Sequence, residues 1–359
     1  MGGTCSGDGS LRPANQARAI HDSHVLTFPA ALPSCTVILC TRRRPEALSL
    51  CLASLRQLRY PDFTILVIEN DAAASEAEGI ATRYGAEYRL CTRQGLSAAR
   101  NLGVRLSSTE LVAFIDDDAT CDPNWLVQSA ARFVDPKVQA VTGTIEFVSS
   151  AKPAHEFDPG DRTVDRATPD WFGMANFGGL GLGSNFLVRR SVLDIVGSFD
   201  ERLGRGAALG CSEENDLLFR IIDAGYAVGT CSQSVVQHPA PKPEAKDQVF
   251  RSIAASTVMV AMLAIEHPTH LLRLTRYLFG AIVRRPQPWR ERPAQMFEDM
   301  ASKKTIYSAL LAGPFIYLRA TLRHLVHGTP ECTASAAART LSAVEPTEDA
   351  AASLRSHVS

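Results

Sequence analysis

Three consecutive aspartates, Asp116 to Asp118, stand in the stretch LVAFIDDDATCDPNWL, directly after an apolar run with strand character. Neighbouring carboxylates repel one another, and burying one without a partner is costly, so they need either solvent or a cation. Hard cations such as Mg2+ and Mn2+ prefer carboxylate oxygens. This stretch alone therefore leaves two interpretations open, a metal site and a solvated turn that caps the helix starting at Pro123.

A second acidic cluster, SEEND at 212–216, opens an amphipathic segment that runs to Gly225. Acidic side chains at a helix N-terminus stabilise the helix by up to about 1 kcal/mol without any catalytic role. Asp216 and Arg220 lie four residues apart and could form a simple ion pair on that helix. The cluster is therefore either a helix cap or a source of reactive carboxylates.

The elements that must position these residues alternate along the chain. Apolar runs at 35–40, 64–70, 86–91, 111–116 and 138–148 predict strands, and the segments between them have helical character. Continuous apolar strands separated by helices predict a mostly parallel sheet covered on both faces, which binds ligands beyond the carboxyl ends of its strands. Polar triplets follow three of these strands, at 41–43, 69–71 and 116–118.

Composition limits the other classes of protein. The 359 residues carry a formal net charge of −1, which argues against a nucleic-acid binder. The nine cysteines form no CxxC pair and predict buried thiols in a reducing compartment. The N-terminus lacks the apolar core of a secretory signal, and no segment has the roughly 20 uninterrupted apolar residues of a spanning helix. We therefore expect a cytoplasmic protein.

The chain divides into four predicted regions. Residues 1–33 are expected to be a disordered tail, and 34–240 a catalytic α/β domain in which 150–183 form a long, partly mobile loop region. Residues 241–328 are expected to be helical, with Lys and Arg interleaved with apolar side chains. Residues 329–359 are rich in Ala, Ser, Thr and Glu and are expected to be a disordered tail.

Over about residues 34–240 the chain resembles the family 2 glycosyltransferases of GT-A fold. The resemblance rests on the order and spacing of VILCTRRRPEALSLCLASL, ILVIEND, GLSAARNLGV, AFIDDDA with PNWL, GSNFLVRRSVLDIVGSFDERL and EENDLLFRIIDAGY. It implies a Rossmann-like, mostly parallel sheet with flanking helices, here followed by a helical C-terminal extension. It also implies an inverting, metal-dependent, hexosyltransferase-like enzyme that moves a sugar from a nucleoside-diphosphate sugar to a hydroxyl acceptor.

The resemblance maps the family's DxD motif onto Asp116 and Asp118. Asp118 would ligate Mg2+ or Mn2+ directly, while Asp116 would contact the ribose or a metal-bound water. His238 stands where related enzymes often have a histidine that contacts the metal or a phosphate, although it could equally be structural. A cation bridging the two phosphates would neutralise the charge of the leaving group.

The same resemblance implies a nucleotide-sugar site at the strand ends. Its residues would be Thr41, Arg43, Glu69, Asp71, Gly95, Arg100 and Asn101, together with Asp116. Glu69 departs from the family, which usually has Asp at this position. Arg42 and Arg44 could instead belong to a solvated basic loop.

The pattern D-L-x-x-R at 216–220 puts Glu214 at the family's catalytic position, with Glu213 as the fallback. Because an acceptor hydroxyl is a poor nucleophile, it needs such a general base. Trp171 and Asn185 are expected to line the acceptor side, although Trp171 could simply pack. With base and metal on opposite sides of the anomeric carbon, the family's outcome is a single displacement with inversion.

The basic, apolar helices of 241–328 suit peripheral association with an anionic membrane, which would place the enzyme at the inner face of the plasma membrane, facing a lipid-linked acceptor. These helices could instead pack on the catalytic domain or on a second subunit. The leading prediction is therefore an enzyme of cell-surface glycan or polysaccharide synthesis. The alternatives are a transferase for a small-molecule or natural-product acceptor and a non-catalytic module that binds nucleotide sugars or glycans.

Overall fold

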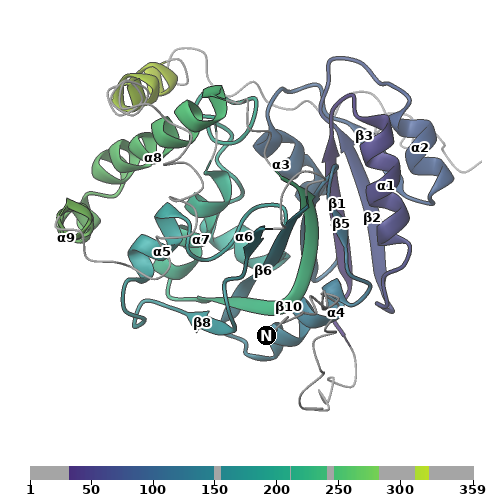
Figure 1. The fold of residues 1–359 in the computed structure, drawn as a ribbon, viewed down its shortest axis with the longest axis horizontal. Helices are drawn as coiled ribbons and strands as arrows, with labels where there is room; N and C mark the ends of the chain where they lie inside the picture. The colour runs from purple at the N-terminus through teal and green to yellow at the C-terminus, as the bar shows by residue number, and fades with distance from the viewer. Residues whose placement is uncertain (1–31, 149–154, 211, 241–245, 283–311, 323–359) are drawn as a thin grey trace, which may run out of the picture.

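The structure is a computed structural model that describes residues 32–148, 155–210, 212–240, 246–282 and 312–322. A twisted sheet runs through its centre, with helices on both faces (Figure 1). The two predicted disordered tails lie outside the described residues, apart from residues 32 and 33. The mostly parallel α/β architecture predicted from the sequence is confirmed.

The sheet has the strand order β3-β2-β1-β4-β9-β6-β10-β5. The parallel half comprises β1 (Cys35–Thr41), β2 (Phe63–Glu69), β3 (Glu87–Leu90) and β4 (Leu111–Asp116). The other half comprises β9 (Phe186–Arg189), antiparallel to both β4 and β6 (Val138–Val148), then β10 (Ala227–Pro239), parallel to β6, and β5 (Thr120–Cys121) at the edge. The carboxyl ends of β1, β2 and β4 therefore lie side by side.

Alternation along the strands divides the core into two layers. On β1, Ile38 faces one layer, while Val37 and Leu39 face the other. The Ile38 layer is covered by α3 (Leu96–Leu106), α5 (Trp171–Phe177), α6 (Arg190–Val196) and α7 (Glu213–Asp223). The opposite layer is covered by α1 (Pro45–Leu55), α2 (Ala77–Arg83) and α4 (Trp125–Ala131), which continues into the short η1 (Arg132–Val134).

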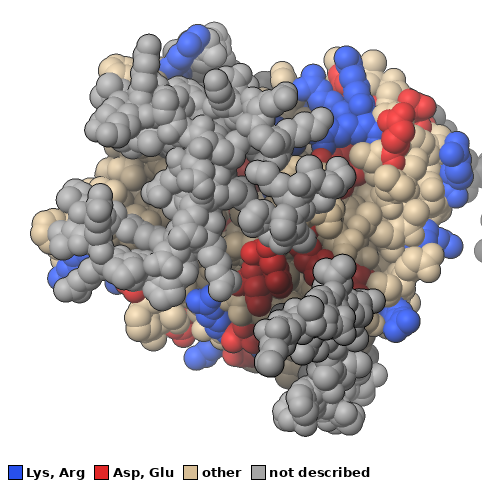
Figure 2. All heavy atoms as spheres, viewed as in Figure 1, with Lys and Arg blue, Asp and Glu red and all other residues tan. Residues whose placement is uncertain are grey.

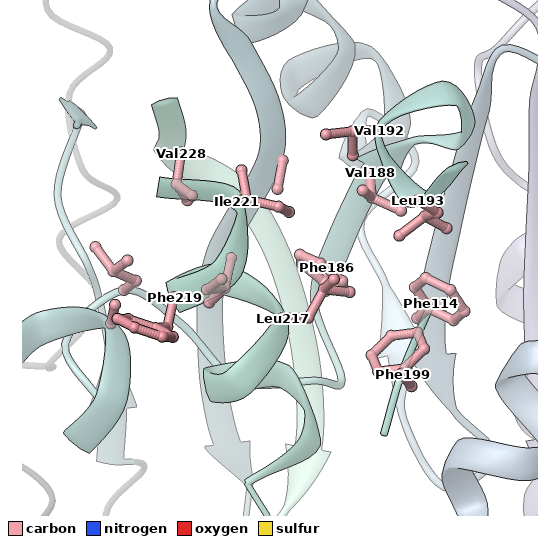
Figure 3. Packing of buried hydrophobic residues seen from close by; sticks show 14 of the residues in the cluster. Phe114, Phe186, Val188, Val192, Leu193, Phe199, Leu217, Phe219, Ile221 and Val228 are labelled. Atoms are coloured by element: carbon pink, nitrogen blue, oxygen red, sulfur yellow. The ribbon is translucent and has the colours of Figure 1, made fainter. Parts of the chain in front are cut away.

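Two features of the Ile38 layer hold the helices α3 and α7 in place. Gly103 lets α3 lie close to β1, because a Cβ at this position would be 2.7 Å from Ile38 Cγ2. The aromatic rings of Phe114, Phe186 and Phe199 form a buried group between the sheet and the helices, with Leu217 of α7 beside them (Figure 3). The helices α3 and α7 are therefore held against the same end of the sheet.

The segment 150–183, predicted to be a long loop, contains regular structure, so that prediction is wrong for its described part. It forms β7 (His155–Phe157), β8 (Arg162–Val164) and α5. β8 pairs with β10, and Trp171 and Phe172 bury their rings against Phe219 of α7. Elements this short show no hydrophobic period in the sequence, since long-range pairing and packing order them.

The described parts of 241–328 are helical: α8 (Lys246–Glu266), η2 (Pro268–His270), α9 (Leu271–Ile282) and residues 312–322. They pack onto the loop between α6 and α7 through a small apolar cluster that joins Leu203 and Leu209 to Met259, Met262 and Tyr317. Among the helices that the structure describes, none combines the length and apolar content needed to cross a membrane.

Candidate active site

The polar residues predicted from the strand ends meet at one edge of the sheet. Thr41 pairs in register with Glu69, and Cys40 with Asp116, so the ends of β1, β2 and β4 are level. The N-termini of α3 and α7 and the end of β10 reach the same edge. Figure 2 shows a group of acidic side chains near the middle of the drawn face and a group of basic ones above it, with other charges of both signs around the rim.

Asp116, Asp118 and His238 form a group that could hold a metal ion. One ligand atom from each lies within 4.8 Å of the others. The Nε2 atom of His238 is 3.2 Å from Asp118 Oδ1 and 3.6 Å from Asp116 Oδ2. All three side chains are partly exposed, so an ion could reach them. Two carboxylates and an imidazole are a donor set that suits Mn2+, and the carboxylates also suit Mg2+.

The electrostatics of this group also favour a cation. Burial lowers the pKa of His238, but its hydrogen bonds to Asp116 and Asp118 outweigh that effect and raise the pKa to about 10. The hydrogen bond from His238 lowers the pKa of Asp118 to about 2. The protonated imidazole thus supplies the positive charge that the two carboxylates need. A metal ion that binds there would have to displace its proton.

Asp117, the middle aspartate, turns away from this group. It accepts a hydrogen bond of 2.7 Å from Thr41 Oγ1 and one of 3.1 Å from Arg44 Nη1. The same Arg44 nitrogen donates to Asp118 Oδ2 at 2.8 Å. The sequence did not decide whether Arg44 is a solvated loop residue or part of the site. Its position just beyond the first strand was the signal that it could contact the aspartates. Its side chain is 42% exposed and is therefore accessible to an anion beside the carboxylates.

Arg100 joins the two acidic clusters. Its Nη1 donates to Glu213 Oε1 at 2.9 Å, and its Nη2 donates to the Gly183 carbonyl at 3.1 Å and lies 3.6 Å from Asp116 Oδ1. The guanidinium is buried beside the touching rings of Phe114 and Phe199, at 5.6 and 5.4 Å from their centroids. Arg100, predicted to belong to the nucleotide-sugar site, therefore lies beside Asp116, one of the two carboxylates of the DxD motif.

The two glutamates of the second acidic cluster differ in their surroundings. Glu213 is buried and ion-paired with Arg100, whereas Glu214 is partly exposed and makes no ion pair within the described part of the chain. Burial, with the charge of Glu213 as the next cause, raises the pKa of Glu214 to about 8. Of the two, only Glu214 has a carboxylate that can exchange a proton with a ligand.

Asp71 and Glu69, two of the predicted nucleotide contacts, differ in the groups that bind their carboxylates. Asp71 accepts hydrogen bonds from Arg43 Nε at 2.5 Å and from the Ala72 amide at 2.7 Å, which lower its pKa. Glu69, by contrast, is fully buried, and its carboxylate is bonded to Ser75 and to the Tyr88 hydroxyl. Glu69, predicted to grip the nucleotide, therefore has its carboxylate bonded to protein groups and buried.

Asn101 and Gly95 also support the site from within. Asn101 is buried and exchanges hydrogen bonds with the backbone of Phe199, at 2.9 and 3.0 Å, so it positions that loop and is not presented to a nucleotide. The Gly95 amide donates to Asn70 Oδ1 at 3.0 Å. Asn70 also donates to the Arg93 carbonyl at 2.6 Å and thereby ties the end of β2 to the start of α3. Sequence reasoning included Asn70 in a polar triplet without assigning it a role.

The two predicted acceptor residues lie in the core, which corrects that prediction. Trp171 is 4% exposed and stacks on Phe219, so the packing alternative holds for it. Asn185 is fully buried; it accepts a hydrogen bond from Trp125 Nε1 at 2.8 Å and donates to the carbonyls of Thr144 and Ser234. A buried amide with these partners ties the sheet to α4 and has no group left for a sugar.

Replacement of Asn185 by Ala is therefore expected to lower the free energy of unfolding by about 2–4 kcal/mol, since it strands several buried polar groups. Urea denaturation followed by circular dichroism measures the loss. The matched control is Asn176→Ala, because Asn176 is as deeply buried but its amide donates only to the Phe172 carbonyl. Unchanged stability of the Asn185 variant, with weaker acceptor binding, would restore the acceptor role.

The family model and the known proteins that resemble this chain point to the same class of enzyme. Residues 36–194 match the family model described as glycosyl transferase family 2. Glycosyltransferase AglE of Haloferax volcanii is 26% identical over 245 residues, which cover 65% of this chain and 76% of that protein. Succinoglycan biosynthesis protein ExoM of Rhizobium meliloti is 27% identical over 217 residues, or 58% of this chain and 67% of that protein.

A third relative is longer. Pre-mycofactocin glycosyltransferase of Mycobacterium tuberculosis is 28% identical over 240 residues, which are 65% of this chain but 48% of that protein, so the match spans about half of its length.

The matched residues run from β1 to α6 and include the strand ends at Thr41, Glu69 and Asp116. The family model and the named relatives both indicate a glycosyltransferase, with the family 2 match lying in residues 36–194. The mostly parallel sheet, with an acidic group beyond β4, agrees with the predicted GT-A fold.

Proposed function

We propose that this enzyme transfers a sugar from a nucleoside-diphosphate sugar to a hydroxyl group, with inversion at the anomeric carbon. The observation that carries the proposal is geometric: one edge of the sheet brings together a group that could hold a cation, made of Asp116, Asp118 and His238, and the partly exposed carboxylate of Glu214. The pKa of Asp118 is lowered to about 2, while that of Glu214 is raised to about 8. Carboxyl groups whose environments push their pKa values apart are typical of sites that divide charge stabilisation from proton transfer.

Asp116, Asp118 and His238 would hold the divalent cation, Mg2+ or Mn2+. Such an ion neutralises the charge that develops on a departing pyrophosphate. Arg44 is accessible beside Asp118 and can share that charge through its guanidinium. Asp117 supports this arrangement indirectly, since it anchors both Arg44 and Thr41.

Glu214 would act on the acceptor. Its ionised carboxylate takes the proton of the acceptor hydroxyl as that oxygen forms a bond to the anomeric carbon and the bond to the pyrophosphate oxygen breaks. The charges of Arg100 and Asp116 both act on Glu214, so Glu214 lies near the cation group. The base and the leaving-group site come from different elements. This arrangement suits attack of the acceptor oxygen on one face of the anomeric carbon while the diphosphate leaves from the other, as in a single displacement.

The acceptor remains a choice between two classes. The printed name of ExoM, succinoglycan biosynthesis protein, supports glycan or polysaccharide synthesis as the first candidate. The name of the pre-mycofactocin glycosyltransferase supports a small-molecule acceptor as the second. A non-catalytic binding module has no use for a partly exposed carboxylate with a raised pKa, and Glu214 argues against it.

The direct test is turnover of a panel of nucleoside-diphosphate sugars by the purified protein, with simple sugars and lipid-linked sugars as acceptors. Release of the nucleoside diphosphate is measured first, and the anomeric configuration of the product is then read by NMR. An inverted product supports the proposal. A product with retained configuration, or nucleotide binding without turnover of any donor, would contradict it.

The pH dependence follows from the raised pKa of Glu214. Below about pH 8 the carboxyl group is protonated and cannot act as a base, so kcat is expected to rise about tenfold per pH unit up to that value and then level off. The measurement is kcat between pH 6 and 9 at saturating donor and metal. A rate that is flat or falls over this range would contradict the assignment.

Peripheral membrane association is supported by one surface of the C-terminal helices. On α9, Leu272 and Phe279 are 63% and 68% exposed, and on 312–322, Phe315 is 73% exposed, with Leu318 and Leu322 on the same stripe. The exposed charges beside them are Arg273, Arg276 and Arg319, and neither 268–282 nor 312–322 contains an acidic residue. Exposed apolar side chains on helices whose own charged residues are arginines suit an anionic lipid surface.

Vesicle flotation tests that surface. The protein is expected to bind vesicles containing anionic lipid, to bind neutral vesicles weakly, and to be released by salt. Phe279→Ser with Phe315→Ser should abolish binding. Leu50→Ser on α1 is the matched control, because Leu50 is equally exposed (67%) but lies on a different helix. Equal loss in the control, or no binding by the unaltered protein, would favour the packing or subunit alternative.

A further inference from the structure

Glu213 stands beside the proposed base but is held by a different set of contacts. Consecutive helical residues point about 100° apart, so the two side chains of the first turn of α7 diverge. Glu213 turns inward to Arg100, and its carboxylate packs against Gly204, where a Cβ would lie 3.4 Å from Glu213 Oε2. That leaves 6% of Glu213 exposed. A carboxylate so enclosed cannot receive a proton from an acceptor.

Arg100 is fixed from every side. Its helix is held against β1 at Gly103, its guanidinium packs on the rings of Phe114 and Phe199, and one nitrogen bonds to the Gly183 carbonyl. A planar guanidinium with several donors at fixed angles sets the relative positions of its partners in a way that a lysine cannot. Those partners include Glu213 at 2.9 Å and Asp116 at 3.6 Å.

We propose that Arg100 and Glu213 form a positioning pair that fixes the first turn of α7, and with it the base Glu214, relative to Asp116. This inference rests on the proposed function. Glu213 touches no substrate; it acts by keeping the proton acceptor and the leaving-group end of the site at a constant separation. Misplacement of a reacting group by about 1 Å can cost about 100-fold in rate, so a buried ion pair at this point has a large effect on kcat.

Four variants separate positioning from catalysis. Glu213→Gln keeps an oxygen that accepts from Arg100, and it is expected to retain kcat within about tenfold. It should also move the rising limb of the pH–rate profile to lower pH, because the charge of Glu213 is one cause of the raised pKa of Glu214. Glu213→Ala and Arg100→Lys are each expected to lose about 100-fold in kcat with little change in the KM for the donor. The double variant Arg100→Lys with Glu213→Ala should be no worse than either alone.

Thermal melting of each variant shows whether it is folded, and the conservative Glu213→Gln variant keeps the test valid if Glu213→Ala is not. The proposal is overturned if Glu213→Gln is as inactive as Glu214→Gln at every pH, since Glu213 would then be the reacting group. It is also overturned if Glu213→Ala turns over like the unaltered protein, or if the double variant shows the product of the two single losses. Absence of turnover in the unaltered protein would instead reject the proposed function.

Discussion

Glu214→Gln is expected to lower kcat by about 10³-fold while the nucleoside-diphosphate sugar still binds. The amide has nearly the shape of the carboxylate but cannot take a proton, and a general base typically contributes 10²–10⁴-fold, roughly, to rate. The loss should persist across the pH range, so the rising limb through about pH 8 disappears together with the activity. Steady-state turnover and calorimetric binding of the donor measure the two parts separately.

Glu214→Asp is the control for this loss. It keeps a base but shortens its reach by one methylene, so partial activity with the same upward pH trend is expected. An active Glu214→Gln variant would remove Glu214 from the mechanism. An inactive variant that has also lost donor binding would indicate structural damage at the start of α7.

Asp118→Asn is expected to have the second largest effect, through the cation. Removing one carboxylate from the group with Asp116 and His238 should weaken Mn2+ binding strongly. A bound metal supplies several kcal/mol of transition-state stabilisation, so turnover at a fixed, limiting Mn2+ concentration should fall by about 10³-fold or more. Titration with Mn2+, followed by calorimetry and by rate, measures both effects, and excess Mn2+ should restore part of the activity.

The matched control is Asp117→Asn, because Asp117 stands in the same triplet but bonds to Thr41 and Arg44. Its Mn2+ affinity should stay within about threefold of the unaltered protein, given that its side chain points away from the ion site. Equal losses of affinity in both variants would mean that the triplet acts as a diffuse patch of charge and that the geometry of Asp118 has no special part.

Most of the parallel half of the fold could be predicted, because each strand there is a continuous apolar run followed by polar residues. β1, β2 and β4 were found in this way, and their level ends explain why the polar triplets meet. The structure of 155–177 could not be predicted. β7 and β8 are three residues each and are ordered only by pairing with β6 and β10, which depends on contacts far along the chain.

The site could be predicted where a residue's neighbours in sequence fix its position. Asp116 and Asp118 meet His238 because β5, just after the aspartates, pairs with the end of β10, with Thr120 opposite Gln237. Glu214 lies in the first turn of α7. Asn101 and Asn185 were misassigned because a polar residue in a motif can equally serve the core. Whether an amide bonds to backbone carbonyls or faces a ligand depends on tertiary contacts that the sequence pattern does not encode.

The measurement that tests the account most directly is nucleoside-diphosphate release by the unaltered enzyme with Mn2+ present, after chelation, and after Mn2+ is restored. The account predicts turnover that chelation abolishes and added Mn2+ recovers, because Asp116, Asp118 and His238 hold an ion needed by the leaving group. Turnover that continues unchanged in the chelator would contradict it, since the three side chains would then have no ion to hold.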